Sequence, residues 1–140
     1  MVIRMAELQA LFQQQFAALA FDKQRFHAAM RGSFGDGYDV RKAERLRVRA
    51  LEGDFGWLPQ ARWVDPEVIE GCASAYYAEW GTVFLSRAIQ HAPALAAATF
   101  VEQAGRILDA QLCPRSSSED RGAAFRRFLG GPGSGLAQLS

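Results

Sequence analysis

The stretch "RMAELQALFQQQFAALA", residues 4–20, points to the fold class because its apolar side chains follow the period of an α-helix. They recur every three or four positions and so fall on one stripe of a helix: Leu8, Leu11, Phe12, Phe16 and Leu19. The glutamines at 13–15 lie largely outside that stripe. The segment therefore predicts a long amphipathic helix that buries one face.

A second, short helix is predicted directly after the first. Asp22 is placed to cap its N-terminus, and Phe21 and Phe26 have the spacing of a hydrophobic staple. Gly32 is placed to end it, since glycine readily adopts the left-handed conformation that follows many helices. The glycine-rich segment "GSFGDGYD", residues 32–39, then predicts a tight loop.

A third helix is predicted in "DVRKAERLRVRALEGD", residues 39–54, with Asp39 as its N-cap and Gly53 near its end. Four apolar residues are expected on its buried face: Val40, Ala43, Leu46 and Ala50. Another face carries three arginines spaced four apart, namely Arg41, Arg45 and Arg49. The pattern predicts an amphipathic helix with a basic outer stripe.

The centre of the chain mixes helix and strand signals. The segment 57–64 could contain a short strand or hairpin. Asp65 as a cap, followed by Pro66 at the first helical position, predicts a helix running to about Trp80 and ended by Gly81. For "TVFLSRAIQHA", residues 82–92, we expect a helix, with a strand as the alternative, because the apolar pattern fits both.

A long helix is predicted from Pro93 until just before Pro114, with a continuous apolar face. The fold class predicted is therefore mainly α, a single compact helical domain over residues 1–113, with α+β as the alternative. Residues 114–140 are expected to hold a short amphipathic helix and a flexible Gly/Pro/Ser tail. That tail helix, with Phe125, Phe128 and Leu129, is expected to dock on its own domain.

Composition limits the classes of function. The 140 residues are 49% hydrophobic, and 16 basic residues against 15 acidic ones give a net charge of +1, so no direct nucleic-acid partner is expected. Cys72 and Cys113 lack the paired spacing of a zinc or redox motif, so neither a metal nor a cofactor is expected. Glu7 and the glutamines interrupt the apolar N-terminus, which predicts a cytoplasmic protein without a membrane span.

The strongest candidate site is an aromatic group around the segment "FGWLPQARWV", residues 55–64. It comprises Trp57, Trp63, Tyr76, Tyr77 and Trp80. On the predicted 65–80 helix, Tyr76 and Trp80 share a face with Cys72, and the loop could pack on them. One interpretation is a pocket for a small amphiphilic ligand or a partner surface, with Asp65 as its acid; the other is a secondary core.

The arginine stripe is the second candidate. Arg41, Arg45 and Arg49 could hold an anionic ligand or an acidic partner, since guanidinium groups match carboxylates and phosphates. The alternative is a solvated helix face, partly neutralised by Glu44 and Glu52. No nucleophile stands in a recognisable spacing to His27 or His91, so no catalytic residue is predicted.

The block "FGDGYDVRKAERLRVRALEGDFGWLPQARWVDPEVIEGC", residues 34–72, resembles the RsaM/TofM type of small regulator associated with acyl-homoserine lactone quorum sensing. The resemblance implies a non-enzymatic cytoplasmic protein that modulates signal production without a DNA-binding motif. It also implies a homodimer, which apolar helix faces left over after folding would permit. The function expected is thus regulation through protein contacts, with a small-molecule-binding domain or an enzyme with an aromatic-lined pocket as the alternative.

Overall fold

The computed structural model describes residues 2–113, 125, 126 and 129 of the chain. Its elements follow in the order α1 (Met5–Phe21), α2 (Lys23–Phe34), α3 (Val40–Leu51), β1 (Gln60–Val64), η1 (Pro66–Ile69), β2 (Ser74–Tyr77), η2 (Ala78–Trp80), β3 (Thr82–Ser86), η3 (Arg87–Ile89) and α4 (Pro93–Leu112), where η denotes a short 3-10 helix. The fold is dominated by helices and carries one small sheet, which matches the α+β alternative.

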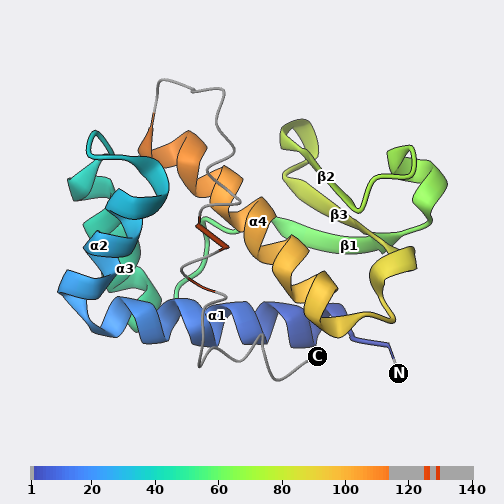
Figure 1. Ribbon diagram of the computed structural model, residues 1–140, viewed down its shortest axis with the longest axis horizontal. Helices are drawn as coiled ribbons and strands as arrows, with labels where there is room; N and C mark the ends of the chain where they lie inside the picture. The colour runs from blue at the N-terminus through green and yellow to red at the C-terminus, as the bar shows by residue number, and fades with distance from the viewer. Residues whose placement is uncertain (1, 114–124, 127–128, 130–140) are drawn as a thin grey trace.

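Two long helices hold the molecule together (Figure 1). α2 and α3 lie at one end, and the sheet lies at the other. α1 runs along one side of both ends and contacts α2, α3 and β1, while α4 crosses between them and contacts α1, α3, β2 and β3. The sheet is therefore tied to the helical end by α1 and α4.

The sheet has the strand order β1-β3-β2, with β3 in the centre. β1 is parallel to β3, and β2 is antiparallel to β3. Because successive side chains of a strand point to opposite faces, the registered pairs place Trp63 with Leu85, and Tyr76 with Val83, on the inner face. Tyr77 and Phe84 lie on the outer face, so the neighbouring tyrosines Tyr76 and Tyr77 of β2 lie on opposite faces of the sheet.

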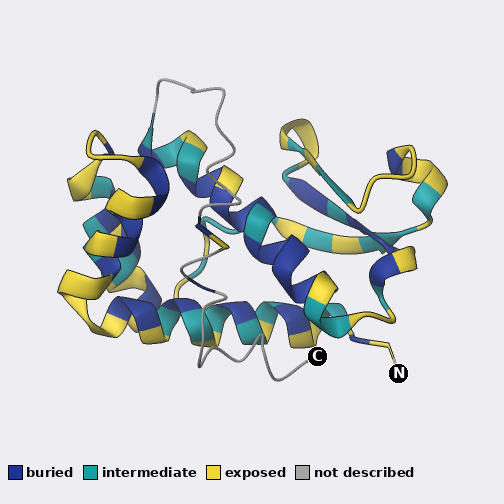
Figure 2. Cartoon of the chain, in the orientation of Figure 1, coloured by how far each residue is buried: buried dark blue, intermediate teal, exposed yellow. Residues whose placement is uncertain are grey.

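The core sits where α1, α2 and α4 meet, and it is rich in phenylalanine. Phe16 has no exposed surface, and its ring lies 5.7 Å from that of Phe26 and 6.3 Å from that of Phe125. Figure 2 shows the same distribution, with buried residues along α4 and on the inward sides of the other helices. Removing any one ring from such a core lowers the stability of the fold, because the cavity left behind does not close fully.

The helices predicted over residues 4–20, directly after Asp22, within residues 39–54 and from Pro93 are present as α1, α2, α3 and α4. The caps predicted for the second and third helices are present: the Asp22 carboxylate accepts a hydrogen bond from the Arg25 amide at 3.1 Å, and that of Asp39 accepts one from the Lys42 amide at 3.0 Å. Asp65, the third predicted cap, accepts no such hydrogen bond. Each bond satisfies a backbone donor that the first helical turn leaves free. These local signals were sufficient to define α2 and α3.

The helix predicted from Asp65 to Trp80 is wrong. Pro66 does begin a helical turn, but η1 ends at Ile69, and Glu70 and Gly71 then adopt positive φ angles of 55° and 80°. The chain reverses there and continues as β2. The helix expected over 82–92 is also wrong: its first half is strand β3, and η3 supplies only one turn.

Smaller expectations about the ends of α2 and α3 also fail. Phe21 is 83% exposed while Phe26 is buried, so the predicted staple does not form. α2 continues past Gly32 to Phe34, and Gly35, with φ of 87°, ends it instead. Val40, predicted to be on the buried face of α3, is exposed.

The strand prediction within 57–64 is confirmed for Gln60–Val64. In the tail, the structure describes only residues 125, 126 and 129. Phe125 and Leu129 are buried in the core, with the Phe125 ring 5.8 Å from that of Phe34. Phe128 and the Gly/Pro/Ser tail lie outside the described residues.

Candidate functional site

The aromatic group predicted from sequence is divided between two faces of the sheet. Trp57 packs on α1, with its ring 6.0 Å from that of Phe12 and 5.5 Å from that of Phe16. Trp63 lies on the inner face of β1, paired in register with Leu85. Both tryptophans pack against the core, and their buried Nε1 atoms have no hydrogen-bond partner within the described part of the chain.

Trp80 belongs to a different cluster on the outer face of the sheet. Its ring lies 5.4 Å from that of Tyr77 and 6.1 Å from that of Phe84, and its side chain is 67% exposed. The prediction that the 57–63 loop packs on Tyr76 and Trp80 is therefore wrong. The prediction fails because this segment is a strand. In β2 the side chains of Tyr76 and Tyr77 point to opposite faces of the sheet, whereas in a helix Tyr76 and Trp80 would lie on the same face.

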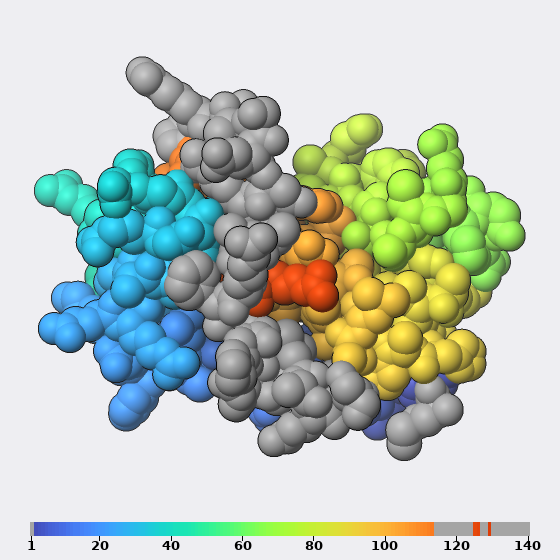
Figure 3. Space-filling view, viewed as in Figure 1, coloured from blue at the N-terminus to red at the C-terminus, as the bar shows by residue number. Residues whose placement is uncertain are grey.

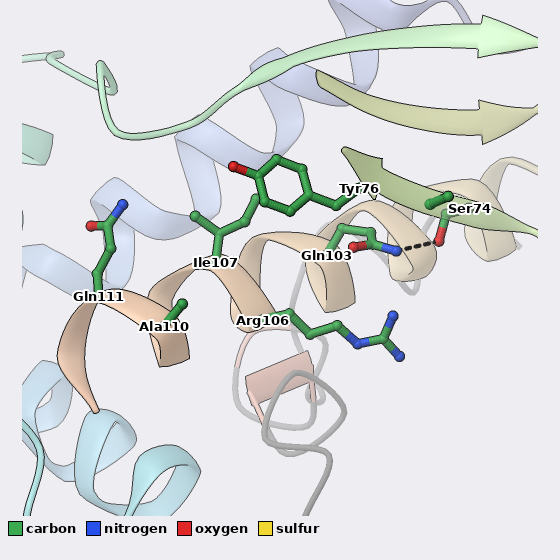
Figure 4. A pocket seen from close by; sticks show the side chains of 8 residues that line it. Ser74, Tyr76, Gln103, Arg106, Ile107, Ala110 and Gln111 are labelled. Atoms are coloured by element: carbon green, nitrogen blue, oxygen red, sulfur yellow. Dashed lines mark hydrogen bonds between the residues drawn. The ribbon is translucent and has the colours of Figure 1, made fainter. Parts of the chain in front are cut away.

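Tyr76 instead forms one wall of a groove between β2 and α4. Figure 4 shows the Tyr76 ring over α4, with Ile107 facing it from the helix. The groove has a volume of about 430 Å³ and is lined by Ser74, Ala75, Tyr76, Gln103, Arg106, Ile107, Ala110 and Gln111. Tyr76 is 41% exposed, so its ring is accessible from the groove. We call this feature the β2–α4 groove.

One end of the β2–α4 groove is polar and fixed. Gln103 is only 3% exposed, and its amide Nε2 donates a hydrogen bond to the Ser74 hydroxyl at 2.7 Å (Figure 4). This bond joins α4 to the edge strand β2 and holds the Gln103 amide group in one orientation. Arg106 extends from α4 away from the Tyr76 ring. The groove thus combines an apolar centre with a fixed amide.

The predicted arginine stripe stands apart from the β2–α4 groove. Arg41, Arg45 and Arg49 are exposed on α3, and in the part of the chain that the structure describes none of them is paired with a carboxylate. None of them lines the groove. Asp65, the proposed acid of the aromatic pocket, instead accepts a hydrogen bond from Arg87 at 3.0 Å on the surface. Cys72 is exposed.

A polar cluster between α2 and α3 was missed by the sequence analysis. The two ring nitrogens of His27 are both engaged: Nδ1 lies 2.7 Å from the Tyr38 hydroxyl, and Nε2 lies 2.8 Å from Glu44 Oε1. Glu44 also accepts two hydrogen bonds from Arg47, at 2.7 and 2.8 Å. We call these four residues the α2–α3 cluster. Only the i,i+3 spacing of Glu44 and Arg47 could have been read from the sequence.

Charge pairing defines the chemistry of the α2–α3 cluster. Hydrogen bonds from Arg47, and then from His27, lower the pKa of Glu44 to about 2, so its carboxylate is ionised. Burial raises the pKa of Tyr38, which keeps its hydroxyl protonated. Because an ionised carboxylate only accepts hydrogen bonds, Nε2 of His27 donates to Glu44.

Comparison with protein-family models, curated proteins and solved structures finds no match to this chain. Among the described residues, no group of three or more His, Cys, Asp or Glu side chains is placed to hold a metal ion. Within the same residues, no helix is both long and apolar enough to cross a membrane.

Proposed function

We propose that this chain is a non-enzymatic regulatory protein that binds a small amphiphilic ligand in the β2–α4 groove. The observation that carries the proposal is the composition of that groove: an accessible Tyr76 ring, an Ile107 side chain opposite it and the fixed Gln103 amide, in about 430 Å³. Ligand sites in proteins have this size and this combination of apolar walls with a few oriented polar groups.

The walls indicate the chemistry of the ligand. Tyr76 and Ile107 offer apolar surface for an aliphatic chain, and the amides of Gln103 and Gln111 offer hydrogen bonds to a polar head. The Ser74 hydroxyl oxygen accepts the Gln103 hydrogen bond, and a nucleophilic serine needs a base to take its proton. The described residues that line the groove include no His, Asp or Glu. The geometry thus supports binding over turnover.

The resemblance of residues 34–72 to regulators of acyl-homoserine lactone signalling gives the ligand class to test first. Acyl-homoserine lactones join an aliphatic chain to a polar ring through an amide, which is the chemistry that the groove would accept. The resemblance and the groove depend on different residues, since the groove is built from residues 74–111. As part of the same proposal, the protein acts in the cytoplasm as a homodimer and modulates signal production through contacts with a partner protein.

The test is calorimetric titration with acyl-homoserine lactones of increasing chain length. We expect saturable binding that strengthens with chain length and weakens at least about tenfold, or about 1.4 kcal/mol, in Tyr76→Ala. Tyr77→Ala is the matched control, because Tyr77 is the next residue of β2 but lies on the outer face. No saturable binding, or an equal loss in both variants, would refute the groove as the site.

A second measurement tests the regulatory part of the proposal. Acyl-homoserine lactone levels are measured by mass spectrometry in the native strain with and without the gene. A change that is restored by the wild-type gene, but not by the Tyr76→Ala gene, would connect the groove to signal production. Unchanged levels would contradict the regulatory function, whatever the groove binds.

A further inference from the structure

A second depression lies on α2, at the end of the molecule away from the sheet (Figure 1). It has a volume of about 580 Å³ and is lined by Lys23, Gln24, His27, Ala28, Arg31, Tyr38 and Val40. Lys23, His27 and Arg31 are spaced four apart and so stand in one row along α2. In Figure 3 the side chains of α2 occupy the end of the molecule away from the sheet.

The lining carries two permanent positive charges and no carboxylate. Lys23 and Arg31 stand one helical turn on either side of His27. Their present partners are weak: Lys23 Nζ lies 3.9 Å from Glu44, and Arg31 Nε lies 3.5 Å from Asp36, whose side chain is 92% exposed. Exposed pairs of this kind contribute about 0–1 kcal/mol, so another anion can replace them at little cost.

The carboxylate of Glu44 already has its hydrogen-bond partners within the protein. Its carboxylate binds Arg47 through two hydrogen bonds and His27 through a third. Arg47 in turn donates from Nη1 to the Ala20 carbonyl at 3.0 Å, which ties the pair to the end of α1. Glu44 therefore helps to hold His27 in place without lining the depression itself.

His27 and Tyr38 form the floor of the depression. Nδ1 of His27 lies 2.7 Å from the Tyr38 hydroxyl, which also donates a hydrogen bond to the His27 backbone carbonyl at 3.5 Å. Nε2 of His27 is held by Glu44 at 2.8 Å. The polar atoms of this floor thus have partners within the protein, and the recognition of an anion depends on Lys23 and Arg31.

We propose that this depression binds a small organic anion whose carboxylate or phosphate head lies between Lys23 and Arg31. Ala28 and Val40 form the apolar part of the lining, against which the hydrocarbon part of the ligand packs. Val40 is exposed although it is apolar and stands in the first turn of α3. This site shares no residue with the β2–α4 groove and does not depend on the function proposed for that groove.

The test is a titration of the full-length protein with butyrate and, separately, with butyl phosphate. Binding is measured by calorimetry and by the chemical-shift changes of backbone amides in NMR spectra. We expect saturable binding of at least one of the two, with shifts centred on α2 and on Tyr38. The paired substitution Lys23→Gln and Arg31→Gln should weaken binding at least about tenfold. Preference for one probe identifies the head group as carboxylate or phosphate.

The matched control removes the same number of charges from the neighbouring helix. The control is the paired substitution Arg41→Gln and Arg45→Gln. Both arginines are exposed on α3 and lie outside the lining of the depression, so the affinity should stay within about twofold of the wild-type value. Ala28→Leu fills the depression at an exposed helical position without changing charge, so it should abolish binding while circular dichroism stays unchanged.

Three outcomes would overturn the proposal: no saturable binding of either probe, an equal loss in the α3 control, or unchanged binding in Ala28→Leu. Tyr76→Ala should leave the affinity for both probes unchanged, because Tyr76 belongs to the other site. A failure of the groove proposal is therefore distinguishable from a failure of this one.

Discussion

Replacing Glu44 by glutamine should remove a pH-dependent part of the stability of this protein. Glu44 connects α2 to α3 through His27 and is held by two hydrogen bonds from Arg47. Its pKa is about 2 in the folded protein against an ordinary value of 4.5. Since a difference of one in pKa corresponds to about 1.4 kcal/mol, full linkage sets a ceiling of about 3 kcal/mol.

The expected effect is smaller than this ceiling because solvent reaches the carboxylate. The Glu44 side chain is 30% exposed, and screening of a partly exposed pair brings the expected loss to about 1 to 2 kcal/mol at neutral pH. The sign follows from the lowered pKa. The contribution is fully present above about pH 5, because the carboxylate is then ionised in both the folded and unfolded states, and it is lost as pH falls towards 2.

The assay is urea unfolding followed by tryptophan fluorescence, at a series of pH values from 7 down to 2.5. The free-energy difference between wild type and Glu44→Gln isolates Glu44, because all other carboxylates titrate in both proteins. It should be largest at pH 7 and shrink through the acid range. Glu52→Gln, at the exposed end of the same helix, is the control and should show a small difference at every pH. A Glu44→Gln difference that does not change with pH would refute the reasoning.

Two further predictions concern the aromatic residues. Phe16→Ala should cost about 3–5 kcal/mol in urea unfolding, because Phe16 is fully buried among other rings, and a loss below about 1 kcal/mol would contradict its place in the core. In Trp80→Phe, iodide should quench far less of the tryptophan emission than in the wild type. Trp80 is 67% exposed, whereas the Nε1 atoms of Trp57 and Trp63 are buried. Unchanged quenching would mean that Trp80 is covered.

The helices could be predicted from sequence because their hydrogen bonds are local. Each backbone amide pairs with a carbonyl four residues earlier, so apolar spacing and a capping residue such as Asp22 or Asp39 carry most of the information. The errors at their ends have the same origin. Whether α2 ends at Gly32 or continues to Phe34 depends on the burial of Phe34 against other elements. The local sequence carries no information about that burial.

The sheet could be predicted only in part. The sequence allows a short strand within residues 57–64, which contains β1. β2 lies in the helix predicted from Asp65 to Trp80, and β3 lies in a segment whose apolar run fits both a helix, which was expected, and a strand, the alternative. β3 pairs with β1 on one side and β2 on the other, so its hydrogen-bond partners are supplied by separate segments. Pro66 is a genuine start signal, yet the positive φ at Glu70 and Gly71 limits it to one turn.

The candidate sites depend even more on tertiary structure. Tyr76 was singled out from the sequence and does line the β2–α4 groove, but its partners Gln103 and Ile107 come from α4 and could not be inferred. His27 meets Tyr38 and Glu44, which lie 11 and 17 residues away, only because α2 packs beside α3. No spacing rule relates residues that a loop brings together.

By itself, the sequence determined the helical class, the two aspartate caps and a near-neutral charge, since these depend on composition and on contacts within one or two turns. Only the tertiary structure decided the three-stranded sheet, the separation of Tyr76 from Trp80 and the joining of His27 to Glu44. The physical reason is that strand pairing and side-chain clustering require partners distant along the chain, and their free energy appears only once the core has brought those segments together.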